Sequence, residues 1–191
     1  MNKRCVAVFG GSFDPIHNGH LALAGEVLGR GLATEVWFMV TPQNPHKQGN
    51  TLSDEQLRLQ MVRLAVEGME GVRACDFEFS LPRPSYTLNT LTALDEAYPE
   101  CCFSLLIGAD NWEKFDRWCR HDEILANYGI IVYPRDNNAV PLLPDGVTWL
   151  PAELHDVSST QIRGLVAGGG SITGLVPAAV EEFIKRKNLY R

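Results

Sequence analysis

Two histidines stand out because they are three residues apart and follow a pair of glycines. The segment Gly10–Leu21 reads GGSFDPIHNGHL and directly follows the apolar run Cys5–Phe9. Two glycines after a buried strand let the chain turn and let a ligand approach main-chain N–H groups closely. A helix is expected to begin at about Asn18–His20, where unpaired N–H groups and the helix dipole favour an anion. His17 and His20 can both meet one negative group there, so this segment predicts a phosphate site.

The same residues admit plainer interpretations. Gly10 and Gly11 could form only a turn while the histidines cap a helix, and two histidines three apart could also bind zinc. The coincidence of an apolar run, two glycines, Asp14-Pro15 and two histidines favours phosphate. The segment matches neither the G-x-x-x-x-G-K-[ST] phosphate loop nor the G-x-G-x-x-G dinucleotide fingerprint.

A second group of polar residues, Ser158-Ser159-Thr160-Gln161-Ile162-Arg163, lies near the other end of the chain. Hydroxyl side chains are favoured at helix N-termini, where they also suit anions. Arg163 follows Ser159 by one helical turn, and its guanidinium can hold phosphate with two N–H groups. Alone, this pattern is most often a plain capped helix with a surface arginine. Two phosphate-suited helix starts in one domain predict a polyphosphate held between them.

Short apolar runs alternate with amphipathic segments, and this alternation predicts the elements that position both groups. Runs that are apolar at every position are typical of parallel strands covered on both faces. The pattern predicts an α/β fold with a Rossmann-like, doubly wound, mostly parallel sheet and helices on both faces. Ligands bind such sheets at the carboxyl ends of the strands, here the loops after Phe9, Val40 and Ile107. The expected strands are Cys5–Phe9, Val36–Val40, Phe103–Ile107 and Ile130–Tyr133, with weaker ones at Val72–Phe77 and Val147–Leu150.

Helices are expected between the strands and at the end of the chain. Ser53-Asp54-Glu55-Gln56 has the form of a capping box, in which Ser53 and Gln56 satisfy each other's N–H groups. We expect one domain over residues 1–191, with a helical part from about residue 158 to 191 packed on the sheet. The expected helices include His20–Leu28, one through Leu57, Met61 and Leu64, one through Leu88, Leu91 and Leu94, Ser158–Val166 and Pro177–Lys187.

Composition narrows the class of protein. The 191 residues include 17 Lys+Arg and 23 Asp+Glu, a net charge of −6, and 45% are hydrophobic. This balance argues against a disordered chain and against a protein that coats nucleic acid. Apolar runs such as Val36–Val40 fall far short of the roughly 20 residues that span a bilayer, and the first residues lack a signal-peptide pattern. The five cysteines form no C-x-x-C pair, so we expect a reducing, cytoplasmic location with no membrane partner.

The two polar groups together resemble the H-x-G-H and S-S/T-x-x-R motifs of the nucleotidylyltransferase superfamily. More closely, the chain is similar to the bacterial nicotinate-nucleotide adenylyltransferases, which join nicotinate mononucleotide to ATP. This narrower resemblance extends over nearly the whole chain. It rests on Thr41–Lys47 (TPQNPHK), Ser85-Tyr86-Thr87, Ile107–Asp110 (IGAD), Trp118 and Val157–Arg163 (VSSTQIR). Small departures from the family pattern are Ser12, Val157 and Cys119, where Thr, Ile and Tyr are common.

The resemblance implies two sets of binding residues. The ATP set is Gly10, Gly11, Ser12, Phe13, His17, His20, Gly108, Asp110, Ser158, Ser159 and Arg163. The backbone of residues 10–13 would contact ATP, and the two histidines would bind the triphosphate. Asp110 would contact the ribose, and the two serines and Arg163 would hold the β- and γ-phosphates. The catalytic members of this set would be His17, His20 and Arg163.

The second set would bind nicotinate mononucleotide and consists of Asn44, Lys47, Ser85, Tyr86, Thr87 and Trp118. Main-chain N–H groups of Ser85–Thr87 would receive the nicotinate carboxylate, and Trp118 would stack on the pyridine ring. Plainer interpretations remain open at this point. Ser85 could be an ordinary N-cap, Trp118 an ordinary core residue with Trp112 as its rival, and Lys47 a solvated loop charge.

The implied reaction is in-line attack of the mononucleotide phosphate on the α-phosphorus of ATP, with pyrophosphate leaving. The attacking group is already an anion, so no general base and no protein nucleophile are expected. No cluster of carboxylates marks a metal cage, so Mg²⁺ is expected to arrive with ATP, with no metal ligands assigned to the protein. The alternatives are a related enzyme acting on nicotinamide mononucleotide or pantetheine phosphate, and a non-catalytic nucleotide-binding module. The oligomeric state stays open, a homo-oligomer included.

Overall fold

A six-stranded sheet forms the centre of the computed structural model, which describes residues 3–42, 52–135, 143–153 and 157–191. The strand order is β3-β2-β1-β4-β5-β6, and every neighbouring pair is parallel. This confirms the doubly wound, Rossmann-like prediction. The strands are β1 (Arg4–Gly11), β2 (Glu35–Val40), β3 (Val72–Cys75), β4 (Cys101–Gly108), β5 (Gly129–Tyr133) and β6 (Val147–Trp149).

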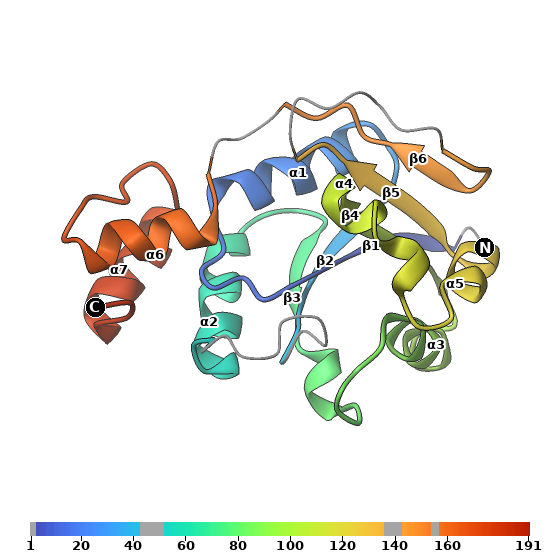
Figure 1. Ribbon diagram of the computed structural model, residues 1–191, viewed down its shortest axis with the longest axis horizontal. Helices are drawn as coiled ribbons and strands as arrows, with labels where there is room; N and C mark the ends of the chain where they lie inside the picture. Colours follow the sequence, from blue (N-terminus) through green and yellow to red (C-terminus); the bar gives the residue numbers. More distant parts are fainter. Residues whose placement is uncertain (1–2, 43–51, 136–142, 154–156) are drawn as a thin grey trace.

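Helices cover both faces of this sheet (Figure 1). Side chains of a strand point alternately to its two faces. Ala7 and Phe9 of β1 therefore join one buried cluster with α1, α2, α6 and α7, while Val6 and Val8 join a second cluster with α3 and α5. The helices are α1 (Asn18–Gly29), α2 (Glu55–Val66), α3 (Thr87–Ala97), α4 (Ala109–Trp112), α5 (His121–Asn127), α6 (Ser159–Ala167) and α7 (Ala178–Lys187), with short 3-10 turns η1 (Phe77–Ser80) and η2 (Phe115–Arg117).

The order of the strands fixes where a ligand can enter. From β1 the chain moves outward to β2 and β3, then returns to the opposite side of β1 as β4. The carboxyl ends of β1 and β4 are thus neighbours at the point where the strand order reverses, which is where such sheets bind ligands. Gly10 and Gly11 end β1, and Gly108 ends β4.

The turn after β1 lies further along the chain than the two glycines suggested. Gly10 and Gly11 belong to the strand and pair with Met39 and Val40 of β2, so the prediction that they form the turn is wrong. The chain turns instead at Phe13, whose φ of 47° is left-handed, and at the cis bond Asp14-Pro15. Gly11 is required for another reason, because a Cβ there would lie 2.8 Å from the ring of Phe13.

The N-cap of α2 differs from the prediction, whereas the N-cap of α6 agrees with it. Asp54, not Ser53, caps α2, since its carboxylate accepts from the N–H groups of Gln56 and Leu57. The predicted Ser53–Gln56 capping box is therefore wrong. Ser158 caps α6, and its hydroxyl and the Gln161 side chain form the reciprocal pair of a capping box.

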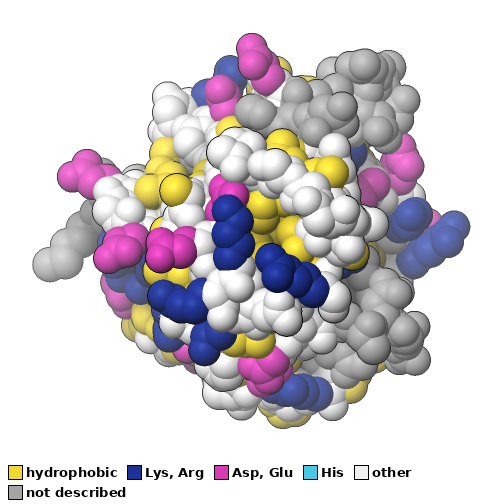
Figure 2. All heavy atoms as spheres, turned by 90° about the vertical axis from the view of Figure 1, so that its left-hand side faces the viewer, with side chains coloured by type: hydrophobic (Ala, Val, Ile, Leu, Met, Phe, Trp, Pro, Cys, Tyr) yellow, Lys and Arg dark blue, Asp and Glu magenta, His cyan; other side chains and the backbone are white. Residues whose placement is uncertain are grey.

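The helices from residue 159 onward pack on the same face as α1 and α2. Ile162 of α6 and Val180, Phe183 and Ile184 of α7 are buried in that face's cluster. Figure 2 shows this side of the molecule, where Lys and Arg side chains gather with acidic ones among them. Within the described ranges, no helix has the length and apolar character needed to span a membrane.

Candidate functional site

His17 and His20 form a stacked pair at the start of α1. Their ring centroids are 3.6 Å apart with planes inclined by 25°. His17 is the N-cap residue, and its backbone N–H donates to Nδ1 of His20 at 3.2 Å. An Nδ1 that accepts a hydrogen bond leaves the proton of a neutral imidazole on Nε2. His20 is therefore oriented as an Nε2–H donor.

His20 is uncharged at neutral pH because of its surroundings. The pKa of His20 is lowered well below its ordinary value of 6.5, chiefly by burial and further by the nearby His17 and Arg135. The rings of Phe9 and Phe13 pack edge-on against it, with centroids 5.7 and 5.1 Å away. In such an apolar setting the imidazole serves as a hydrogen-bond donor and not as a cation.

The serine and arginine of the second motif contact the turn that leads into this histidine pair. Arg163 Nη1 donates to the carbonyl of Asp14 at 2.7 Å, and Ser159 Oγ donates to the carbonyl of Pro15 at 2.9 Å. The start of α6 and the turn before α1 are thus held side by side, although they are about 150 positions apart in sequence. The structure brings the two motifs together at the carboxyl end of β1.

Gly108, Asp110 and Arg135 lie at the end of β4, beside the end of β1. Asp110 belongs to the short helix α4, and its carboxylate lies 3.4 Å from Nε of Arg135. A side chain at Gly108 would meet both, because its Cβ would lie 2.9 Å from Arg135 Nε and would contact Asp110 Oδ1. Glycine at this position therefore leaves room for the Asp110–Arg135 pair.

The Ser85-Tyr86-Thr87 segment forms the start of α3. In a parallel sheet, α3 runs back from the carboxyl end of β3 to the start of β4, so its N-terminus faces the edge where β1 and β4 end. Tyr86 is the N-cap residue and Thr87 the first helical residue, so the interpretation of Ser85 as N-cap is wrong. The buried Ser85 hydroxyl instead donates to Glu78 Oε2 at 3.3 Å.

Glu78 is a buried carboxyl group beneath this helix start. Thr90 Oγ1 donates to its Oε1 at 2.8 Å, in addition to the Ser85 bond. Burial raises the pKa of Glu78 above its usual range, and the two hydroxyl groups partly oppose that shift. Glu78 thereby ties η1 to the first turn of α3.

Trp118 and its rival Trp112 share one aromatic cluster. The ring of the buried Phe115 has its centroid 5.2 Å from that of Trp112 and 5.4 Å from that of Trp118. Both tryptophans are partly exposed, so each retains surface for a planar ligand. The predicted residues Asn44 and Lys47 lie outside the described residues.

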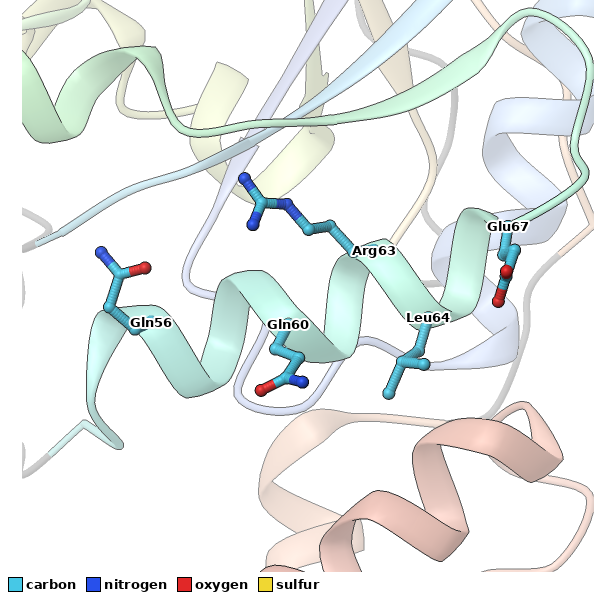
Figure 3. A pocket seen from close by; sticks show the side chains of 5 residues that line it. All are labelled: Gln56, Gln60, Arg63, Leu64 and Glu67. Atoms are coloured by element: carbon cyan, nitrogen blue, oxygen red, sulfur yellow. The ribbon is translucent and has the colours of Figure 1, made fainter.

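A hollow on the outer side of α2 is separate from these groups (Figure 3). Its volume is about 480 Å³, and its lining residues are Gln56, Gln60, Arg63, Leu64 and Glu67. None of them belongs to either predicted binding set. Of the side chains labelled in Figure 3, Gln56, Gln60, Arg63 and Leu64 come from α2, and Glu67 is the residue that caps its C-terminus.

Comparison with known proteins gives the family. Residues 8–165 match the cytidylyltransferase-like family model. A Bacteroides fragilis protein named as a probable nicotinate-nucleotide adenylyltransferase is 47% identical over 96% of this chain and 92% of its own. A Bacteroides thetaiotaomicron protein of the same name is 43% identical with the same coverage. The chain belongs to the nicotinate-nucleotide adenylyltransferase family. The same fold occurs in the Plasmodium falciparum nicotinic acid mononucleotide adenylyltransferase complexed with NaAD, with a TM-score of 0.78, 17% identity, and coverage of 98% of this chain and 97% of the other.

Two arginines of this family member were not identified from its sequence. Arg135 lies two residues after the end of β5 and near both His20 and Asp110. Its position after a buried strand was the available signal, because the carboxyl end of every strand in a parallel sheet faces the ligand edge. Arg58 is a fully buried guanidinium on α2. Its position between Leu57 and Leu59, two apolar residues of that helix, was its only signal in the sequence.

Proposed function

We propose that this protein transfers the adenylyl group of ATP to nicotinate mononucleotide, forming NaAD and releasing pyrophosphate. The observation that carries the proposal is the stacked His17–His20 pair beside Arg163 at the reversal point of the sheet. The names of relatives that match nearly the whole chain support the choice of acceptor.

In this proposal the triphosphate lies between the starts of α1 and α6. Helix N-termini present unpaired N–H groups and positive dipole ends, both of which favour phosphate oxygens. Nε2–H of His20 would donate to the α-phosphate, and His17 would lie beside it. Arg163 donates one N–H to the Asp14 carbonyl, and its other N–H groups would bind the β- and γ-phosphates together with Ser158 and Ser159.

The adenosine would lie at the ends of β1 and β4. The backbone of Gly10, Gly11, Ser12 and Phe13 would approach the nucleotide, and a side chain at Gly10 would point into open space instead of into protein. Gly108 and Asp110 would contact the adenosine, Asp110 through the ribose. Arg135, paired with Asp110, would add a positive charge on this side.

The acceptor would occupy the side of α3. Its nicotinate carboxylate would receive N–H groups of Ser85, Tyr86 and Thr87 at the helix start, and Trp118 would stack on the pyridine ring. We propose Asn44 and Lys47, which follow β2 in the sequence, for the same substrate. Together these groups would direct the acceptor phosphate toward the α-phosphorus.

The chemical step is an in-line displacement. The acceptor phosphate oxygen forms a bond to the α-phosphorus while the bond to the bridging oxygen of the β-phosphate breaks, and pyrophosphate leaves with that electron pair. Nothing has to be deprotonated, so catalysis rests on positioning and on donors that meet developing charge. Holding two reactants in line can supply roughly 7–11 kcal/mol of the barrier.

Mg²⁺ would enter as part of the substrate, bound to the ATP phosphates, and would offset their negative charge. The side chains nearest the proposed phosphate site are donors such as His20 Nε2–H and Arg163, which suit phosphate oxygens. The described residues include no group of three or more His, Cys, Asp or Glu side chains that could hold a metal ion. We also place this reaction in the cytoplasm, where the five free cysteines would stay reduced.

The test is pyrophosphate release by the purified protein with ATP, Mg²⁺ and each of three acceptors. We expect nicotinate mononucleotide to give NaAD and the highest kcat/KM. Nicotinamide mononucleotide and pantetheine phosphate should react at least tenfold less efficiently, since neither carries the ring carboxylate. A higher kcat/KM with either of these acceptors would overturn the assignment of the acceptor, and no transfer to any of them would overturn the activity.

A further inference from the structure

The turn between β1 and α1 is held from outside by several side chains. Its carbonyl groups at Ser12, Asp14 and Pro15 accept from Arg58 Nη1 at 2.6 Å, Arg163 Nη1 at 2.7 Å and Ser159 Oγ at 2.9 Å. This turn ends two residues before His17. Any shift of the turn therefore moves the histidine pair and the N-terminus of α1.

The Asp14 side chain adds a further attachment to this turn. Asp14 is only 1% exposed, and a buried carboxylate needs donors for its oxygens. Its Oδ2 accepts from the backbone N–H of Ser53 at 3.1 Å, and its Oδ1 accepts from the hydroxyl of Tyr190 at 2.6 Å. The two donors come from the start of α2 and from the end of the chain.

Tyr190 is held in an unusual backbone conformation to make this bond. The chain leaves α7 through Asn188, with φ of 52°, and Tyr190 itself has φ of 63°. A left-handed conformation is disfavoured for a bulky residue and persists where the surrounding contacts hold it in place. Burial and the Asp14 carboxylate raise the pKa of Tyr190, so the hydroxyl keeps its proton and remains a donor.

Arg58 holds the other side of the same turn. Besides the Ser12 carbonyl, its guanidinium donates to the carbonyls of Thr41 at 2.9 Å and Pro42 at 3.2 Å, at the end of β2, and to Ser53 at 2.9 Å. Arg58 and Tyr190 therefore fix the turn from two directions, one from α2 and one from the chain's last residues. Of the two contacts, the tyrosine hydroxyl can be removed with little change in shape.

We propose that Tyr190 is a positioning residue for the nucleotide site: its hydroxyl, through Asp14, fixes the turn that sets the His17–His20 pair against the triphosphate. This inference rests on the proposed function, since it assumes that the turn borders ATP. Tyr190 acts through Asp14 and touches no substrate.

The test is Tyr190→Phe, which removes the hydroxyl and keeps the ring. We expect the Kd of a non-hydrolysable ATP analogue, measured by calorimetry, and the KM for ATP to rise about tenfold, the effect of losing one hydrogen bond to a charged group. The KM for nicotinate mononucleotide should change less than twofold, because the described residues proposed for the acceptor belong to the start of α3 and the end of η2 and not to this turn.

Tyr128→Phe is the matched control. The Tyr128 hydroxyl donates to Asp95 Oδ2 at 2.7 Å, which is the same kind of bond, but on the side of α3 and α5 away from the turn. We expect this variant to bind the ATP analogue as the wild type does, even if its Tm falls.

Three outcomes decide between the possibilities. If Tyr190→Phe lowers the Tm but leaves the Kd and KM for ATP unchanged, Tyr190 is merely structural and the proposal is overturned. If the wild type binds the ATP analogue but makes no NaAD, the proposed function fails, while the Kd of Tyr190→Phe still tests Tyr190. If the wild type does not bind the ATP analogue, both fail.

Discussion

The backbone N–H of His17 donates to Nδ1 of His20 at 3.2 Å, while the two imidazole rings stack at a centroid distance of 3.6 Å. One hydrogen bond thus fixes both the orientation and the tautomer of His20. Burial disfavours the protonation of His20, and the neighbouring His17 disfavours it further, because two stacked imidazolium rings would repel each other. The pair presents a neutral N–H donor at a helix N-terminus, where the positive end of the helix dipole disfavours a cation.

The direction of this donor leads to a prediction about His20 variants. We expect His20→Ala to lower kcat by about 10²- to 10³-fold, the scale of removing one donor that meets developing charge. His20→Gln places an amide N–H near the position of Nε2 and should keep more activity than His20→Asn, whose amide reaches only the position of Nδ1. Steady-state kinetics of folded variants are the measurement. A loss of less than threefold for His20→Ala would contradict the role of His20.

The same histidine makes the stability of the protein depend on pH. Because the folded pKa of His20 lies below its unfolded value, the unfolded chain binds the extra proton first. The free energy of unfolding should therefore decrease as the pH falls below about 6.5, by at most about 1.4 kcal/mol per pH unit from this residue. Urea unfolding of the wild type and of His20→Gln between pH 7.5 and 5.5 checks this. Equal pH slopes for the two proteins would show that His20 titrates normally when folded.

The sequence was sufficient to predict those parts of the fold that depend on local patterns. Runs such as Val36–Val40 are apolar at every position, a pattern typical of strands in a parallel sheet covered on both faces. Once the sheet is parallel, its carboxyl ends share one edge, which is where Arg163 contacts the turn that precedes His17. Hydroxyl residues were also expected to cap the helix that begins near Ser158, and Ser158 does cap α6, with Gln161 as its reciprocal partner.

Features that depend on distant contacts could not be predicted. Gly10 and Gly11 end β1 because β2 extends alongside them as far as Val40, which no local pattern indicates. Ser53 resembles an N-cap, yet its N–H bonds to Asp14, and Asp54 caps the helix instead. Tyr190 reaches Asp14 across the whole chain. In each case the outcome depends on a contact with a distant part of the chain, which a local pattern does not reveal.

Arg135 provides a test that separates ligand binding from stability. Its ion pair with Asp110 is long, at 3.4 Å, and both side chains are about half exposed, so the pair should contribute less than about 1 kcal/mol to folding. We expect Arg135→Ala to leave the Tm within a few degrees of the wild type while raising the KM for ATP roughly fivefold, the equivalent of about 1 kcal/mol. Arg117→Ala, an exposed arginine of η2, is the control. An unchanged KM for ATP would place Arg135 outside the nucleotide site.

Glu78 predicts a pH dependence of the opposite sign. Burial raises its folded pKa, so the folded protein holds this proton more tightly than the unfolded chain does. The contribution of Glu78 to stability is therefore largest at acid pH and is lost as the pH rises from its unfolded value near 4.5 through the folded pKa. We expect the free energy of unfolding of Glu78→Gln, relative to the wild type, to increase between pH 4.5 and 7. A relative stability that stays constant over this interval would mean that folding does not raise the pKa of Glu78.

The start of α3 allows the proposed carboxylate site to be tested through its backbone. Thr87 is the first helical residue, a position where proline fits, and Tyr86 has φ of −95° and ψ of 144°, which a following proline accepts. Thr87→Pro therefore removes one N–H donor with little effect on the helix, whereas Thr87→Ala removes only the hydroxyl and keeps that donor. We expect Thr87→Pro to reduce the preference for nicotinate over nicotinamide mononucleotide, measured as the ratio of kcat/KM values, by at least about tenfold. Thr87→Ala should keep most of the preference. If both variants discriminate as the wild type does, the N–H of residue 87 does not bind the carboxylate, because it is the one donor that separates the two variants.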